Sequence, residues 1–273
     1  INPHTVVSDV KEECKLILSG DITKVNLEKQ KEILNLAEYF SKNYQLRVFD
    51  GKEFIVFEYP ISFSYGLKPG WISGLAQSSQ FVLFAAASIM STDENTKKQY
   101  SEIVDKILYT FLVPVEKGGV LVELENGYWF EEYAQIGVEP PLVLNGHNYV
   151  LENLYMLKDY TNTSFLFDKG FQGLVDNIQQ YDIYSWSYYD RTKLPANLKY
   201  QKIHINQLKF LSEITDDSKI KEYYKKFLMQ SYFPFSSLQR FIIKPSTFLG
   251  GLIIINTIFI FILLYFWRRK CLK

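Results

Sequence analysis

The stretch "ISGLAQSSQFVLFAAASIM", residues 72–90, decides the fold class of this chain. Placed on a helix, its residues are apolar almost all the way round, which is typical of a helix buried on every side. It follows a Pro-Gly turn in "YGLKPGW", residues 65–71. A chain of 273 residues is long enough to surround such a helix with a sizeable core. We therefore expect a mainly helical domain.

Apolar residues at helical spacing predict further helices on both sides of this stretch. The first covers residues 26–43, where Asn26 can cap the start. The second covers residues 93–112 and has an acidic first turn. The others are expected over residues 140–160, 161–181, 201–215 and 217–233.

Short strands interrupt this helical pattern. "GGVLVELENGYWFEEY", residues 118–133, indicates a hairpin, because Asn-Gly is a strong signal for a tight turn between strands. "EFIVFEYPI", residues 53–61, indicates a short strand that Pro60 interrupts. Residues 184–200 are irregular and aromatic. We expect antiparallel helix pairs wrapped into an α/α toroid with a small β-hairpin element; a plain helical bundle or repeat array is the alternative.

The C-terminal segment has the composition of a membrane span. Residues 248–267 contain no charge, and about 20 apolar residues suffice for a helix to cross a bilayer. The basic tail, residues 268–273, predicts a cytoplasmic C-terminus. We expect a single-pass membrane protein whose main domain is lumenal (Golgi or ER) or extracellular. A tail anchor, which would leave the domain cytosolic, and a buried core helix are the alternatives.

Composition limits the classes of ligand to expect. The formal net charge is zero, so the sequence implies no global electrostatic attraction to nucleic acid. The 20 Tyr and 21 Phe indicate either a ring-rich core or a groove lined with rings, which suits the faces of sugars. The two cysteines and three histidines are scattered, so we expect no metal site, no disulfide framework and no cofactor.

Four stretches place polar side chains among aromatic ones. They are "WFEEYAQ" with Glu131, Glu132 and Tyr133; "SWSYYDR" with Tyr188, Tyr189, Asp190 and Arg191; "KYQKIHINQL" with Tyr200, His204, Asn206 and Gln207; and "KPGWISGLAQSSQ" with Trp71 and Gln77. Each has a structural alternative, since half-buried tyrosines commonly bond their hydroxyls within the protein. The glutamates could equally face water at the end of a hairpin.

Five motifs occur in one order that is specific as a set: "PGWISGLAQ", "FEEYA", "LVLNGHNYVLENLYML", "YYDR" and "PANLKYQKIHINQL". From about Tyr59 to Leu211 the sequence resembles the C-terminal catalytic domain of D-glucuronyl C5-epimerases, the enzymes of heparan sulfate maturation, and their microbial relatives. It departs from that pattern at Ser78 and Ser79, and Arg191 follows Asp190 without the residue that separates Asp and Arg in the animal enzymes.

The resemblance and the apolar C-terminal segment together predict a division of the chain. Residues 1–58 would be an N-terminal helical part that lacks its natural start, since the first residue is Ile. Residues 59–240 would be the toroidal catalytic domain, followed by the membrane helix at 248–267 and the tail at 268–273.

The resemblance also implies an activity and a site. The activity is conversion of D-glucuronic acid to L-iduronic acid units within a glycosaminoglycan-like polysaccharide. The catalytic residues it implies are Tyr133, Tyr189, Tyr200 and Glu132. The substrate-binding residues it implies are Arg191, Trp71, Gln77, Asn145, His204 and Asn206. The implied partner is an anionic uronic-acid polysaccharide, beside the lipid bilayer contacted by residues 248–267; a homodimer stays open.

These residue types suit the chemistry. Inverting C5 of a uronic acid requires an acid/base group on each face of the sugar, and a tyrosine can act as the base if its pKa is lowered. The charge that develops on the carboxylate needs a donor, for which the fork of Arg191 is suited. Lys193, Lys199 and Lys202 form a local basic run that fits an anionic polymer, or only a solvated surface.

Three other functions stay open. A uronic-acid polysaccharide lyase begins with the same proton abstraction and then expels the group at C4. A glycoside hydrolase would need two flanking carboxyls, for which Glu132 and Asp190 are candidates. A membrane-tethered glycan-binding protein would bind the polymer without catalysis.

Overall fold

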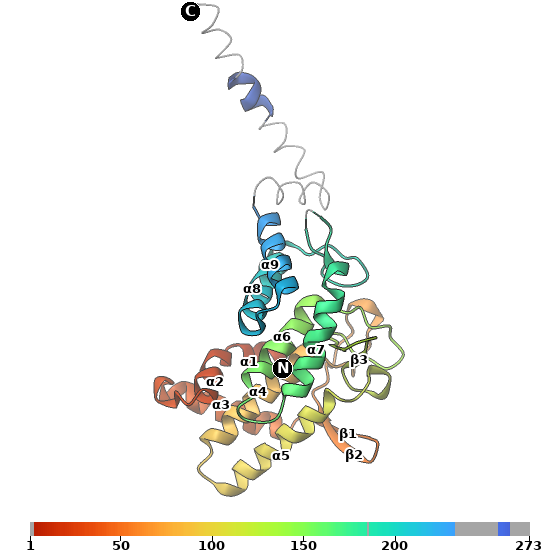
Figure 1. Cartoon of the computed structure of the whole chain (residues 1–273). Coiled ribbons are helices and arrows are strands. Elements are labelled where there is room, and N and C mark those ends of the chain that lie inside the picture. The colour runs from red at the N-terminus through yellow and green to blue at the C-terminus, as the bar shows by residue number, and fades with distance from the viewer. Residues whose placement is uncertain (1–2, 185, 233–255, 263–273) are drawn as a thin grey trace, which may run out of the picture.

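The computed structural model describes residues 3–184, 186–232 and 256–262, and the described chain is mainly helical with two short hairpins (Figure 1). The helices are α1 (Pro3–Ser8), α2 (Lys11–Leu18), α3 (Leu27–Ser41), α4 (Gly74–Met90), α5 (Glu94–Thr110), α6 (Leu144–Met156), α7 (Ser164–Asn177), α8 (Leu198–Thr215) and α9 (Ser218–Gln230). Short 3₁₀ turns lie at Ile22–Lys24, Ser64–Gly66, Val115–Lys117 and Ile178–Tyr181.

Helix α4 lies at the centre of the packing. Helices α1, α2, α3, α5 and α6 all contact it, and every residue from Gly74 to Ser88 is buried. Its apolar second half joins the main hydrophobic core. Polar side chains in its first half donate hydrogen bonds to segments outside the helix: Gln77 Nε2 donates to the Phe57 carbonyl, and Gln80 Nε2 donates to the Pro3 carbonyl. The prediction of a helix buried on every side is confirmed.

Side-chain caps explain where several helices begin. Asn26, Asp93, Asn197 and Asp217 each accept a backbone N–H from the residue three positions later. Such a bond satisfies one of the amide groups that the first turn of a helix leaves without a partner. The predicted cap at Asn26 is confirmed, and consecutive helices then pack in pairs, α4 with α5, α6 with α7, and α8 with α9.

Both hairpins are antiparallel. The predicted one joins β3 (Leu121–Glu123) to β4 (Tyr128–Phe130), with Leu121 opposite Phe130. Gly127 is required at its tip, since a Cβ there would come within 2.6 Å of backbone atoms of α7. The predicted strand after residue 53 is β2 (Lys52–Val56), and it pairs with β1 (Gln45–Phe49). Strand β1 was not predicted, because it is mostly exposed and shows no buried alternation.

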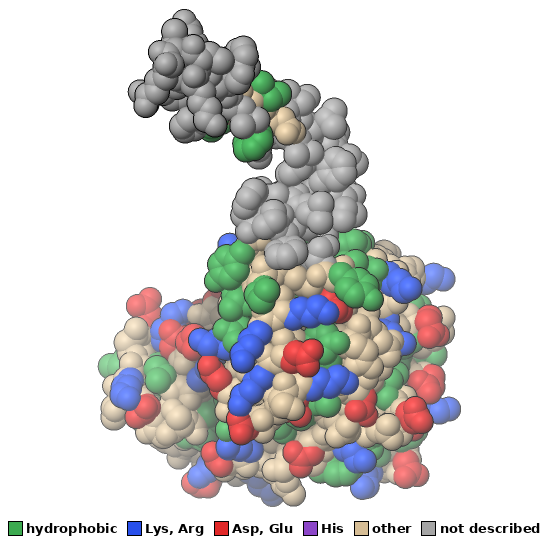
Figure 2. Space-filling model, turned by 45° about the horizontal axis from the view of Figure 1, so that its top comes forward, with side chains coloured by type: hydrophobic (Ala, Val, Ile, Leu, Met, Phe, Trp, Pro, Cys, Tyr) green, Lys and Arg blue, Asp and Glu red, His purple; other side chains and the backbone are tan. Residues whose placement is uncertain are grey.

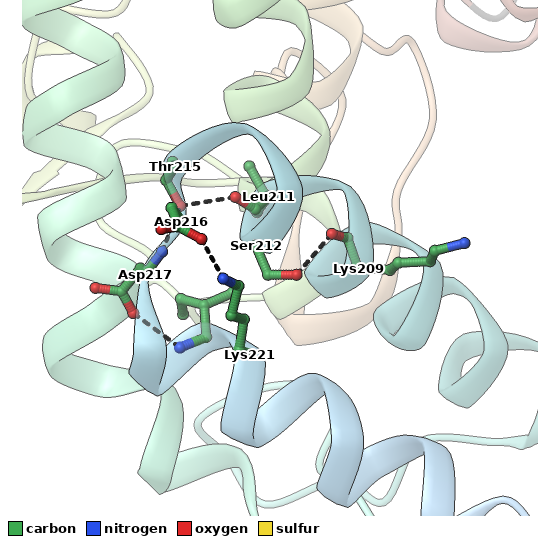
Figure 3. Close-up of polar contacts among 8 residues, drawn as sticks. Lys209, Leu211, Ser212, Thr215, Asp216, Asp217 and Lys221 are labelled. Atoms are coloured by element: carbon green, nitrogen blue, oxygen red, sulfur yellow. Dashed lines mark hydrogen bonds and ion pairs between the residues drawn. The ribbon is translucent and has the colours of Figure 1, made fainter.

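The turn between α8 and α9 is closed by short-range polar contacts (Figure 3). Thr215 Oγ1 donates to the Leu211 carbonyl at 2.7 Å, and Asp217 Oδ1 accepts the Ile220 amide at 2.8 Å. Asp216 adopts a left-handed backbone conformation and forms an ion pair with Lys221. These contacts let α9 fold back along α8, which carries part of the candidate site.

The membrane-spanning helix predicted over residues 248–267 must be corrected. Within the described parts of the chain, no helix is both long enough and apolar enough to cross a bilayer. Of the predicted span, residues 256–262 are described, and they are helical. The rest of the predicted span and the tail at 268–273 lie outside the described residues. The membrane localisation depended on this helix, so that prediction is corrected as well.

Candidate active site

Two segments far apart in the sequence form one wall of the site. Ile72 and Ala134 exchange backbone hydrogen bonds of 3.0 and 2.9 Å, and the Gly74 amide donates to the Glu131 carbonyl at 2.8 Å. Gly74 is needed for this approach, since a Cβ there would lie 2.7 Å from the Glu131 carbonyl oxygen. The "PGWISG" and "FEEYA" motifs are therefore neighbours in space.

Glu131 holds the loop that follows this wall. It is fully buried, and its two carboxylate oxygens accept the Tyr133 amide at 2.9 Å and the Leu142 amide at 2.8 Å. Burial raises its pKa to about 7, although these amide donors oppose the rise. These two contacts hold the loop between Tyr133 and Leu142 in place.

Glu132 is also buried, and its side chain lies against Gly146 of helix α6. Asn145 Nδ2 donates to its Oε2 at 3.2 Å, and its carboxyl group also hydrogen-bonds the Tyr133 side chain. Burial, and next the charge of Glu131, raise its pKa to about 8. Gly146 lets the carboxyl group rest directly on α6, since a Cβ there would lie 2.4 Å from Oε2. Glu132 therefore carries a proton at neutral pH.

Three tyrosines, Tyr133, Tyr189 and Tyr200, form what we call the tyrosine cluster. The hydroxyl groups of Tyr133 and Tyr189 are 3.1 Å apart, and the rings of Tyr189 and Tyr200 are 4.5 Å apart. Tyr189 lies in the segment of residues 187–196, which we call the second wall. This segment is fixed on α6 because the Tyr189 carbonyl accepts the Leu144 amide. Burial, and next the charge of Glu132, raise the pKa of Tyr133 and of Tyr189, so both hydroxyls are protonated at neutral pH.

Trp71 belongs to a hydrophobic cluster beside the tyrosines that is separate from the main core. It stacks on Tyr59 with ring centroids 4.0 Å apart and planes 7° from parallel, and its ring lies 5.7 Å from that of Tyr133. Its Nε1 donates to the Ile61 carbonyl at 2.9 Å. Trp71 thus supports the wall that carries Tyr133.

His204 holds the second wall against helix α8. Its Nδ1 is 2.9 Å from Ser187 Oγ, which also donates to Gln201 at 2.6 Å. Burial lowers the pKa of His204 to about 3, so the ring is neutral. Through Ser187, His204 links helix α8 to the segment that carries Tyr189.

The structure does not bring every candidate residue to the cluster. Asn206 is exposed on α8, and Gln77 bonds the Phe57 carbonyl. Arg191 is exposed, and its Nη1 donates to Asn177 at the end of α7 over 3.4 Å. Asn145, another of the residues expected to bind substrate, contacts Glu132 directly.

The basic run lies at the surface. Lys193, Lys199 and Lys202 are exposed, and Lys199 Nζ is 5.9 Å from the centre of the Tyr200 ring. Over the face shown in Figure 2, Lys and Arg side chains lie among Asp and Glu side chains. A cavity of about 470 Å³ borders the wall on the side of Ile72 and Ala134, and Lys68 lines it.

One residue of the site was missed. Tyr65 lies in the "YGLKPGW" stretch, which showed only a turn, but its ring is 5.2 Å from Tyr133 and its hydroxyl donates to Asp190 at 2.5 Å. No local pattern could have revealed this contact, because 125 positions separate the two partners.

The arrangement can move protons. Asn145, Glu132, Tyr133 and Tyr189 form a continuous line of hydrogen-bonded side chains, and Glu132 has a pKa close to physiological pH. A group whose pKa lies near the working pH is the most effective general acid or base. In the described parts of the chain, no three His, Cys, Asp or Glu side chains are placed to share a metal ion.

Comparisons with known proteins match the part of the chain that carries these site residues. The family model described as D-glucuronyl C5-epimerase C-terminus matches residues 50–229. An uncharacterized protein of Methanocaldococcus jannaschii is 32% identical over 184 residues, which is 63% of this chain and 57% of that protein. The D-glucuronyl C5-epimerase of Caenorhabditis elegans is 26% identical over 188 residues, 61% of this chain and 30% of that protein. The chain thus covers less than two thirds of either relative, and it belongs to the D-glucuronyl C5-epimerase C-terminal domain family.

Proposed function

We propose that this domain converts D-glucuronic acid to L-iduronic acid units within an anionic polysaccharide. The observation that carries the proposal is the hydroxyl pair of Tyr133 and Tyr189, 3.1 Å apart, with the raised-pKa carboxyl group of Glu132 beside Tyr133. The family supports an epimerase-like role. The substrate, the direction of reaction and the residue roles are our inference.

The proton balance of the reaction can be written with these residues. The C5–H bond breaks, its electron pair moves toward the sugar carboxylate, and the proton passes to the Tyr133 oxygen as the Tyr133 proton passes to ionised Glu132. A hydroxyl on the opposite face of the sugar then donates its proton to C5; Tyr200 is the candidate, since the Tyr189 hydroxyl is 3.1 Å from that of Tyr133 and therefore lies on the same face. This relay requires the ionised form of Glu132. A pKa of about 8 leaves a fraction of the protein in that form near neutral pH, and it makes the Glu132 carboxylate a stronger base than an ordinary one.

The charge that develops on the sugar carboxylate needs a donor. Arg191 is our candidate, since guanidinium groups bind carboxylates through two parallel hydrogen bonds. Its contact with Asn177 is exposed and 3.4 Å long, so it can be exchanged for a substrate contact at little cost. We expect Arg191→Lys to raise KM, because a lysine cannot form the bidentate contact.

The polymer needs more room than one sugar occupies. The cavity of about 470 Å³ next to Ala134 can hold a neighbouring unit, with Lys68 at its edge. Lys193, Lys199 and Lys202 can attract the anionic chain from the other side of the cluster. Added salt should therefore weaken binding, because exposed charges are screened.

Isotope exchange tests this proposal. We would incubate the full chain with an unsulfated glucuronic acid polymer, and separately with its N-sulfated form, in D₂O and read C5 by NMR. We expect deuterium at C5 together with iduronic acid signals, and both should disappear in Tyr133→Phe and Tyr200→Phe. Tyr109→Phe is the matched control, since it removes a hydroxyl that donates to the Phe49 carbonyl on the β1–β2 hairpin.

The alternative functions give different products. A lyase would release an unsaturated sugar that absorbs in the ultraviolet, and a binding protein would retain the polymer with no exchange at C5. The hydrolase is disfavoured, because both Asp190 oxygens already accept protein donors, from Tyr65 on one side and from Thr192 and Leu194 on the other. Absence of exchange on both polymers would refute the epimerase proposal.

A further inference from the structure

A tight turn crosses the candidate site beside Tyr133. Residues 63–67 form it, with the Phe63 amide donating to the Leu67 carbonyl at 3.1 Å. Tyr65 and Gly66 occupy its tip with φ of 64° and 77°. Glycine adopts such a conformation readily, whereas a bulky side chain such as Tyr65 does so rarely. Contacts of the Tyr65 side chain must therefore compensate for its unfavourable backbone.

The Tyr65 hydroxyl reaches the second wall. It donates to Asp190 Oδ2 at 2.5 Å, and Asp190 is completely buried. The other oxygen of Asp190 accepts Thr192 Oγ1 at 2.7 Å and the Leu194 amide at 3.3 Å. Since Asp190 directly follows Tyr189, a contact that fixes Asp190 also fixes the backbone from which the Tyr189 hydroxyl projects.

The Tyr65 ring contacts the first wall. Its centroid lies 5.2 Å from that of Tyr133, and Phe63 from the same turn lies 5.4 Å from Tyr133 on a nearly parallel plane. Together with Trp71 at 5.7 Å, these rings enclose Tyr133. One side chain therefore contacts Tyr133 through its ring and the neighbour of Tyr189 through its hydroxyl.

We propose that Tyr65 is a positioning residue that sets the separation between the Tyr133 and Tyr189 hydroxyl groups. Its ring and its hydroxyl bond to Asp190 act as a brace between the two walls. This inference rests on the proposed function for its effect on catalysis, because Tyr133 is the proposed base and its hydroxyl is hydrogen-bonded to that of Tyr189. Misplacement of reacting groups by about 1 Å can reduce a rate by about a hundredfold.

Tyr65→Phe tests the brace, since it retains the ring and removes only the bond to Asp190. If the wild type catalyses exchange, we expect kcat to fall by about tenfold or more in this variant while KM changes less than about twofold. Tyr109→Phe, which also loses one protein-bound hydroxyl, should keep both parameters within about twofold. A folded Tyr65→Phe protein with unchanged kcat would overturn the inference while leaving the proposed function intact.

A second readout does not depend on activity. Tyrosines 133 and 189 are buried with raised pKa, so they should resist nitration by tetranitromethane, which reacts with ionised and accessible phenols. We expect Tyr65→Phe to increase nitration of these two residues several-fold, measured by mass spectrometry of their peptides, with no change in Tyr109→Phe. Unchanged nitration in Tyr65→Phe would reject the brace even in a protein that shows no exchange.

Asp190→Asn covers the case in which Tyr65→Phe does not fold. The asparagine oxygen can keep the Thr192 and Leu194 contacts, and its amide can donate to the Tyr65 hydroxyl. We expect nitration of Tyr133 and Tyr189 to rise above the wild-type level in Asp190→Asn, and an unchanged level would contradict the brace. Where Tyr65→Phe does fold, the combined variant should show no further increase over Tyr65→Phe. Independent, additive effects of the two changes would contradict a brace that acts through this one bond.

Discussion

Glu132 should make the stability of the protein fall as pH rises. Burial and the charge of Glu131 raise its folded pKa from 4.5 to about 8, so the folded state holds the proton more tightly than the unfolded state does. Its contribution to stability is fully present below the unfolded value of 4.5 and is lost as pH rises through the folded value of about 8. Glu132→Gln removes the titrating group and retains a neutral side chain of the same shape.

The size of this effect follows from the two pKa values. One proton difference changes the free energy of unfolding by about 1.4 kcal/mol per pH unit. Between pH 5 and pH 9 the wild type should lose about 4 kcal/mol relative to Glu132→Gln, and about 1.4 kcal/mol of that loss falls between pH 7 and pH 9. Burial lowers the pKa of His4, His147 and His204, but these residues occur in both proteins and their contributions cancel.

Urea unfolding at pH 5, 6, 7, 8 and 9, followed by tryptophan fluorescence, measures this difference. The two proteins should have similar stability at pH 5 and diverge above it, with the variant the more stable. Glu139→Gln is the control, because Glu139 is exposed in the same loop and this variant should follow the wild type at every pH. A wild-type-to-variant difference that stays constant within about 0.5 kcal/mol would refute the conclusion that Glu132 is buried with a proton.

Three further substitutions probe the support of the site. Gly146→Ala should displace Glu132, since the new Cβ would lie 2.4 Å from its Oε2 and 2.5 Å from its Cβ; we expect a loss of about 1–3 kcal/mol in urea unfolding and loss of C5 exchange. Glu131→Gln places an amide donor against one of two backbone N–H groups, so the free energy of unfolding should fall by about 1–3 kcal/mol. Asn197→Ala removes the cap that accepts the Tyr200 amide at 3.1 Å and should cost about 1 kcal/mol, read as a lower Tm; an unchanged Tm would mean that the cap does not stabilise α8.

Some elements could be predicted because local sequence is enough to specify them. Helix α4 follows from an almost wholly apolar run, α3 from spacing and the cap at Asn26, and the β3–β4 hairpin from Asn126-Gly127. Each signal lies within the element itself. Strand β1 escaped prediction because its partner, and not its own burial, determines that it is a strand.

The sequence by itself determined the helical class, the cap at Asn26, the Asn126-Gly127 turn, and the set of motifs that the family shares, because each depends on neighbouring residues. Only the tertiary structure decided which of those residues meet. It placed Tyr133 against Tyr189 across 56 positions and Tyr65 against Asp190 across 125, while it left Arg191 beside Asn177 and Asn206 in solvent. It also set the pKa of Glu132, because burial is a property of the surrounding walls and not of the residue.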